Sequence, residues 1–165
     1  MDKFYEKVNK LLEEYIGGQI FFTELDKAVK FDKDILEQLL TYVRQQTFML
    51  NAKTIASGEI GLALHNFGLD VDLLVPGGLR HDPSKINLEP FKHIINDRNI
   101  IFIDDSYFSG RTATVIEEEI SRCGGNLTHI FVAYDGSRER NEKVYSLYRY
   151  YDHYDILGRP IKKEG

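Results

Sequence analysis

The chain has 165 residues, of which 42% are hydrophobic and 28% are charged, a composition typical of one globular domain with a substantial core. The formal net charge of −5 leaves no basic excess to neutralise phosphates, so the composition argues against a nucleic-acid-binding protein. No apolar run reaches membrane-spanning length and residues 1–14 lack the apolar core of a signal peptide, so we expect a cytoplasmic protein without a membrane anchor.

Residues 1–46 have the apolar spacing of helices and contain no strand pattern. The spacing predicts one helix over 2–16 and a shorter one over 24–30. A third helix is expected over 33–46, with Asp32 as its N-cap because its carboxylate can accept backbone N–H groups. We therefore interpret 1–46 as a helical N-terminal segment.

After residue 46 short apolar runs alternate with helical patterns. The expected strands cover residues 47–56, 71–75, 99–104 and 127–134. The expected helices cover residues 60–67, 112–123 and 138–151, and residues 79–92 form a long irregular segment. Such alternation predicts an α/β fold with a mainly parallel sheet and flanking helices. We assign the α/β core to 47–137 and a C-terminal helix and tail to 138–165.

The most specific pattern begins at the third expected strand. The apolar run 100–103 is followed by Asp104 and Asp105, a short loop, and then the sequence Ser-Gly-Arg-Thr at 109–112, where a helix should begin. A helix N-terminus suits a phosphate, because its first N–H groups are unpaired and its dipole is positive there. Two carboxylates suit sugar hydroxyls or a hydrated Mg²⁺. The pattern therefore predicts a phosphate site with either sugar hydroxyls or a hydrated Mg²⁺ beside it.

This segment resembles the phosphoribosyl-pyrophosphate (PRPP) motif of type I phosphoribosyltransferases, in which a hydrophobic strand ends in two acids and a Ser/Thr-Gly-x-Thr turn follows. The order of elements matches over about 48–135, and the acid-pair motif alone is specific at residue level. The resemblance implies that Asp104 and Asp105 hold the ribose hydroxyls. It also implies that the 5′-phosphate is bound by Ser106, Tyr107, Phe108, Ser109, Gly110, Arg111 and Thr112.

In this family a loop of small residues after the first core strand binds pyrophosphate. That place is occupied here by Ala56, Ser57, Gly58 and Glu59. Glu59 departs from the pattern, because an extra carboxylate repels pyrophosphate. A rival loop contains Gly77-Gly78, but it lies so close to Asp104 in sequence that little room remains for a helix and a strand between them.

The family also has a flexible loop that closes over the site and brings basic residues to the pyrophosphate. Residues 79–92 have the matching position, and Arg80 and Lys85 are the catalytic candidates. The resemblance implies that Mg²⁺ arrives bound to PRPP, near Asp104 and Asp105. The histidines have no metal-ligand spacing, and Cys123, the single cysteine, reads as a small core residue, so we expect no structural metal and no intrachain disulfide.

The resemblance implies Mg²⁺-dependent transfer of a phosphoribosyl group from PRPP to a nitrogenous base or base-like acceptor, with release of pyrophosphate, by a homodimer. Phe108 stands where 6-oxopurine enzymes have an acid, so the chain is nearer to the orotate and adenine enzymes. The base-binding hood could come from 1–46 or from the tyrosine-rich tail. The alternative is a non-catalytic regulatory protein that binds PRPP or a nucleotide on the same fold, and Glu59 favours it.

Overall fold

The central feature of the structure is one sheet of six strands in which every strand pairing is parallel. The computed structural model describes residues 3–14, 23–25, 27–28, 32–75 and 86–161. The strand order is β2-β1-β3-β5-β4, and β6 also pairs with β5. The strands are β1 (Ala52–Ser57), β2 (Leu73–Val75), β3 (Asn99–Ile103), β4 (Ser106–Tyr107), β5 (Asn126–Asp135) and β6 (Val144–Arg149). The predicted α/β fold with a mainly parallel sheet is confirmed.

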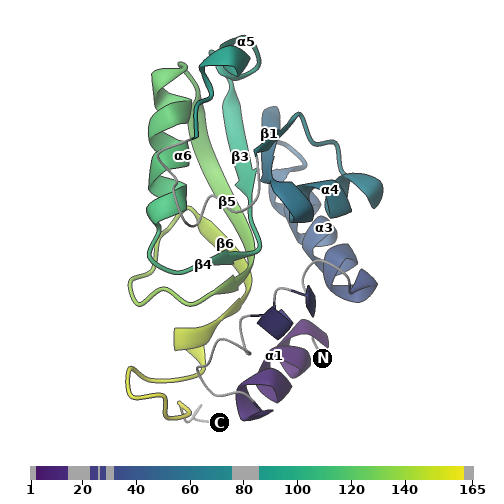
Figure 1. Ribbon diagram of the computed structural model, residues 1–165, viewed down its shortest axis with the longest axis vertical. Helices are drawn as coiled ribbons and strands as arrows, with labels where there is room; N and C mark the ends of the chain where they lie inside the picture. The colour runs from purple at the N-terminus through teal and green to yellow at the C-terminus, as the bar shows by residue number, and fades with distance from the viewer. Residues whose placement is uncertain (1–2, 15–22, 26, 29–31, 76–85, 162–165) are drawn as a thin grey trace.

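Helices cover both faces of this sheet. Figure 1 shows α6 along one face and α3 and α4 along the other, with α1 near the end of the sheet where β6 finishes. Among the described residues, no helix has the length and apolarity needed to cross a membrane. The helices are α1 (Lys3–Glu14), α3 (Lys33–Thr47), α4 (Gly58–Asn66), α5 (Lys92–Ile95) and α6 (Arg111–Arg122), with single turns at η2 (Glu89–Phe91) and η3 (Tyr150–Asp152).

The hydrophobic core has two layers because successive side chains of a strand point to opposite faces. On β3, Ile101 and Ile103 belong to the cluster that contains the apolar side of α3. Ile100 and Phe102 belong to the cluster beneath α6, which also buries Cys123. β3 is therefore covered on both sides, which explains its uninterrupted apolar sequence.

The predicted helix over 138–151 is wrong. Residues Val144–Arg149 form β6, which extends the sheet in parallel to β5 with Val144 opposite Ile130. The tyrosines of this segment do recur at helical spacing, but the segment is rich in aromatic residues that suit a strand, and pairing with the edge of β5 satisfies its backbone.

Two other predicted elements differ in extent. The strand expected over 47–56 begins at Ala52, because α3 continues to Thr47, whose hydroxyl donates to the carbonyl of Val43 (2.6 Å). The turn between them leaves Phe48 largely exposed. The described part of the irregular segment 79–92 contains η2, and α5 begins at its end.

The predicted N-cap of α3 is confirmed. The carboxylate of Asp32 accepts the backbone N–H groups of Asp34 (3.0 Å) and Ile35 (3.3 Å), and it also pairs with Lys7 on α1. The hydrogen bond from Lys7 is the main cause that lowers the pKa of Asp32 below its ordinary 3.8, and the two backbone N–H groups act in the same direction. A lowered carboxyl pKa adds stability above pH 3.8 that is lost as the pH falls through the folded-state value.

Replacing Asp32 by alanine should lower the free energy of unfolding at pH 7 by about 1 kcal/mol, because the cap and the charge are both lost. Asp32→Asn is the matched control: it keeps an N-cap oxygen and should cost less. The stability gap between wild type and Asp32→Asn should close as the pH falls below 3.8. Urea unfolding measures all three proteins, and equal stability of wild type and Asp32→Ala would contradict this account.

Candidate active site

The strand order reverses between β1 and β3. β2 lies on one side of β1 and β3 on the other, so the chain turns back across the sheet at this point. Ala56 is opposite Ile103, and Ser57 and Asp104 follow them at the carboxyl ends of their strands. In open parallel sheets, ligands bind outside the carboxyl ends of the strands at such a reversal. The topology alone therefore points to the sheet edge that carries Ser57 and Asp104.

Asp104 and Asp105 lie between β3 and β4, two strands that follow each other in the chain and both pair with β5. The N–H of Asp104 donates to the carbonyl of Phe131 (2.9 Å), and the carbonyl of Asp105 accepts the N–H of Ala133 (3.1 Å). β4 then continues along the same edge of β5 in the register that β3 had. The acid pair is thus held on both sides by backbone pairing to β5.

The two carboxylates occupy different surroundings. Asp104 is half-buried and lines a cavity of about 290 Å³, whereas Asp105 is buried and is not among the lining residues. The Asp104 carboxylate accepts the N–H of Asp105 (2.8 Å), and the Asp105 carboxylate accepts the hydroxyl of Ser106 (3.3 Å). Asp104 is therefore the acid that can meet a molecule in the cavity, and Asp105 shapes the turn that follows.

The cavity brings together the whole of the predicted phosphate loop. Its floor comes from the sheet, and its wall is the turn between β4 and α6. The lining residues are Phe102, Asp104, Ser106, Tyr107, Phe108, Ser109, Gly110, Arg111, Thr112, Ala113, Ile130 and Val132. The seven residues that the motif assigned to phosphate binding are all in this set.

Gly110 gives the loop its shape. Its φ of +77° is a left-handed conformation that glycine adopts at low cost, and it is the N-cap residue of α6. No side chain caps α6 by a hydrogen bond from this position, although the hydroxyl of Ser109 accepts the N–H of Arg111 (3.3 Å). The start of a 12-residue helix thus borders the cavity, where the N–H groups of its first turn and its dipole favour an anion.

The predicted pyrophosphate loop has a tighter form than expected. β1 ends at Ser57 and α4 begins at Gly58, so the strand passes directly into the helix. Ser57 is the N-cap residue, without a side-chain cap hydrogen bond, and Glu59 lies exposed in the first turn. Ala56 is fully buried in the core and serves packing. What the sequence predicted as a loop is therefore the N-terminus of α4.

Several predicted residues lie outside the described part of the chain. The rival Gly77-Gly78 loop and both basic candidates, Arg80 and Lys85, fall within residues 76–85, which the structure does not describe. On the far side of that gap Ile86 and Leu88 are buried in the core beneath α6. The described chain is therefore in the core at both sides of that gap, at Val75 and at Ile86.

An aromatic column connects the cavity with the N-terminal helix. Phe108, which is 37% exposed, contacts Tyr134 (5.7 Å between ring centroids), and Tyr134 stacks on Tyr148 (5.7 Å). Tyr148 in turn stacks on His153 and faces Tyr5 of α1. Burial raises the pKa of Tyr134, so its hydroxyl stays protonated at neutral pH. Both segments considered for the hood, the N-terminal helices and the tail, thus reach the phosphate loop through packed rings.

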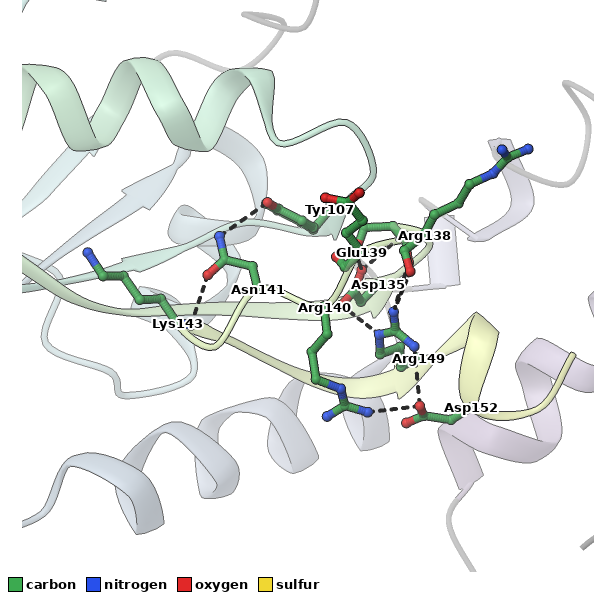
Figure 2. Close-up of polar contacts among 10 residues, drawn as sticks. Tyr107, Asp135, Arg138, Glu139, Arg140, Asn141, Lys143, Arg149 and Asp152 are labelled. Atoms are coloured by element: carbon green, nitrogen blue, oxygen red, sulfur yellow. Dashed lines mark hydrogen bonds and ion pairs between the residues drawn. The ribbon is translucent and has the colours of Figure 1, made fainter. Parts of the chain in front are cut away.

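Sequence reasoning missed Arg149, which lies close to the phosphate loop without lining the cavity. Asp135 ends β5 and Arg149 ends β6, and the two residues are opposite each other in the sheet. Figure 2 shows Arg149 between Asp135 and Asp152, with Asn141 reaching the hydroxyl of Tyr107. Arg149 escaped notice because it fell inside the expected helix 138–151. An arginine at the carboxyl end of a parallel strand would have been the signal.

The comparison with solved structures gives a fold. Orotate phosphoribosyltransferase from Mycobacterium tuberculosis, in complex with inorganic phosphate, is similar with a TM-score of 0.53 and 12% identity, over 76% of this chain and 76% of that one. The chain has the type I phosphoribosyltransferase fold. Other similar structures are a hypoxanthine-guanine phosphoribosyltransferase from Bacillus anthracis (TM-score 0.48, 12% identity, 72% and 77% coverage) and a purine phosphoribosyltransferase from Pyrococcus horikoshii (0.48, 12%, 69% and 82%).

No family model matches the sequence, and neither does any curated protein. At such low identity the likeness establishes the type I phosphoribosyltransferase fold and no more. What the site does must therefore be argued from its own residues.

Gly110→Ala should cost about 1–2 kcal/mol of stability, because a side chain strains a left-handed backbone. Its Cβ would also lie 2.6 Å from the hydroxyl oxygen of Tyr107, so the loop should shift and inorganic phosphate should bind more weakly. Gly158→Ala is the matched control, with φ of +78° and no part in lining the cavity.

Titration calorimetry with inorganic phosphate measures binding, and thermal unfolding measures stability. We expect both variants to lose a similar amount of stability, and only Gly110→Ala to bind phosphate more weakly. A binding defect of equal size in Gly158→Ala would contradict the assignment of the loop.

Proposed function

We propose that the protein transfers the phosphoribosyl group of PRPP to a nitrogenous base or base-like acceptor, with Mg²⁺ and release of pyrophosphate. The observation that carries this proposal is that Asp104, the loop from Ser106 to Thr112 and the start of α6 all border the same cavity. An acid for hydroxyls and a helix N-terminus for a phosphate fit the two ends of a ribose 5-phosphate.

In this proposal the 5′-phosphate accepts backbone N–H groups of the loop and the hydroxyls of Ser109 and Thr112. Asp104 accepts hydrogen bonds from the ribose hydroxyls, and Asp105 fixes the turn behind it. The bond from ribose C1 to pyrophosphate breaks as the bond to the acceptor nitrogen forms. Holding the ribose by both ends lowers the entropic cost of bringing C1 to the acceptor.

Carboxylate oxygens are the donors that Mg²⁺ prefers, so the residues at this edge fit the ion that PRPP carries. Asp104 is the acid that would meet it or its water shell, and the buried Asp105 would act only through the turn that it supports. When bound, Mg²⁺ neutralises charge on the leaving pyrophosphate. The first turn of α4, from Ser57 to Glu59, lies across the strand reversal and is our candidate for the pyrophosphate end.

The remaining parts of the proposal follow the sequence resemblance. Arg80 and Lys85, which lie outside the described residues, supply positive charge to the pyrophosphate. Phe108 gives the acceptor side an aromatic surface without an ionisable group, which favours an orotate-like or adenine-like acceptor over a 6-oxopurine. The N-terminal helices and the tail form the hood over the acceptor, and the working form is a cytoplasmic homodimer.

PRPP with Mg²⁺ should bind the wild-type protein, and Asp104→Asn should weaken that binding about tenfold, since a hydrogen bond to a charged group is lost. Asp70→Asn is the matched control, because Asp70 is an exposed acid before β2, at the amino end of the sheet. Titration calorimetry measures both, and circular dichroism checks that the fold survives. Equal affinity of wild type and Asp104→Asn would remove the ribose assignment.

A non-catalytic PRPP-binding regulatory protein is the second candidate, and Glu59 favours it. Its carboxylate lies exposed in the first turn of α4, where an enzyme needs to attract pyrophosphate. A screen of bases for pyrophosphate release separates the two functions: release with any base supports the transferase, and binding without release supports the regulator.

Glu59→Gln should tighten PRPP binding several-fold, because it removes the repulsion between Glu59 and the pyrophosphate while the side chain keeps its shape. Glu118→Gln, at an exposed position of α6, is the control for a general change of net charge. Calorimetric titration at low and high salt measures the effect, which should shrink as salt screens the charge. Unchanged affinity in Glu59→Gln would mean that α4 does not meet the pyrophosphate.

A further inference from the structure

Three residues form a row across the carboxyl end of the sheet. Tyr107 on β4 is opposite Asp135 on β5, and Asp135 is opposite Arg149 on β6. Tyr107 belongs to the loop that lines the cavity, whereas Asp135 and Arg149 do not line it. The row thus links the edge strand β6 to the phosphate loop through the end of β5.

Arg149 holds the chain that leaves β5. Its Nη2 atom donates to the carbonyls of Ser137 (3.0 Å) and Arg138 (3.2 Å), and its Nε atom lies 3.6 Å from the carboxylate of Asp135. The Arg149 side chain is 10% exposed and that of Asp135 is 3% exposed, so the pair is shielded from water. At the surface, Nη1 also lies 3.3 Å from the carboxylate of Asp152.

Asp135 closes the same turn from the inside. Its carboxylate accepts the N–H of Ser137 (2.9 Å) and the hydroxyl of Ser137 (2.6 Å). The start of the β5–β6 loop, residues 136–139, is therefore fixed by one buried carboxylate and one buried guanidinium (Figure 2). A buried ion pair adds little net stability. Here the Nε atom of Arg149 makes no hydrogen bond, so the geometry is set by the bonds of Nη2 to the two carbonyls and by those of the Asp135 carboxylate to Ser137.

The β5–β6 loop in turn holds the phosphate loop. The N–H of Gly136 donates to the carbonyl of Tyr107 (2.8 Å), and the side-chain amide of Asn141 donates to the hydroxyl of Tyr107 (3.3 Å). Gly136 also packs so closely that a Cβ there would lie 2.6 Å from the ring of Phe108. The Tyr107 hydroxyl lies next to the left-handed Gly110. Each contact fixes a residue that lines the cavity.

We infer that Arg149 is a positioning residue, which keeps the loop from Ser106 to Thr112 in its anion-binding shape by clamping the β5–β6 loop against Tyr107 and Phe108. The role of the loop in holding the 5′-phosphate rests on the proposed function, but the clamp itself does not. The fork of the guanidinium is essential, because one side chain must reach two carbonyls and a carboxylate at once.

The test compares Arg149→Lys with Arg140→Lys. Lysine at 149 keeps the charge, but its single nitrogen cannot lie at the two carbonyls and beside the Asp135 carboxylate at once, so the fold should survive with a loosened loop. Arg140 also pairs with Asp152 (2.9 Å) from the exposed surface and makes no contact with residues 136–139 among its described hydrogen bonds, so it controls for the loss of an arginine.

In the ligand-free protein, amide hydrogen exchange of the segment 106–112 should rise about tenfold in Arg149→Lys and stay unchanged in Arg140→Lys. Exchange in β1 and α3 should not change. A general loss of stability would raise it there as well. The dissociation constant for PRPP with Mg²⁺ should rise about tenfold in Arg149→Lys alone. If Arg149→Lys does not fold, Asn141→Ala, which leaves the buried pair intact, should raise exchange in the same segment.

The inference would be overturned if the segment 106–112 exchanged in Arg149→Lys at the same rate as in the wild-type protein. The same holds for Asn141→Ala where that variant is needed. A rise of equal size throughout the sheet would also overturn it. If PRPP does not bind the wild-type protein but exchange in 106–112 rises as stated, the clamp stands and the proposed function fails. If PRPP binds wild type and Arg149→Lys equally with unchanged exchange, the proposed function stands and the clamp fails.

Discussion

The whole arrangement depends on one constraint, the parallel alignment of six strands with a reversal of order between β1 and β3. Because every strand points the same way, the segments that follow β1, β3, β5 and β6 emerge at a single edge. The helices that cover both faces bury the strands and leave this edge as the place where polar side chains can gather. Each described residue of the candidate site owes its position to that geometry.

Within this frame, the interruption between β3 and β4 produces the site. Backbone pairing to β5 holds the chain before and after Asp104 and Asp105, so the two acids are fixed without being part of a regular ladder. Asp104 then borders the cavity and Asp105 supports the turn. The left-handed Gly110 directs the chain into α6, so that an acid and a helix N-terminus border the same cavity. The β5–β6 loop, fixed by Arg149 and Asp135, closes this unit from the side.

The parts that the sequence predicted well are those set by local chemistry. The apolar run of β3, the acid pair and the turn with Gly110 are consecutive in the chain, and so is the cap of α3 by Asp32. The failures arose where distant pairing decides the structure. The segment 144–149 has helical spacing of its tyrosines and becomes a strand because the edge of β5 is open to it. Arg149 was hidden by that error, and the tightness of the β1–α4 junction depends on packing of α4 against the sheet, which no local pattern reveals.

The most direct test of the account is to map where PRPP binds by following the backbone amide resonances of the protein during titration with PRPP and Mg²⁺. The account predicts that the largest changes fall on 106–112, with a second group at the start of α4, and that these changes saturate together. Changes concentrated at the amino end of the sheet, around Asp70 and Asp72, or saturation that leaves 106–112 unaffected, would contradict it.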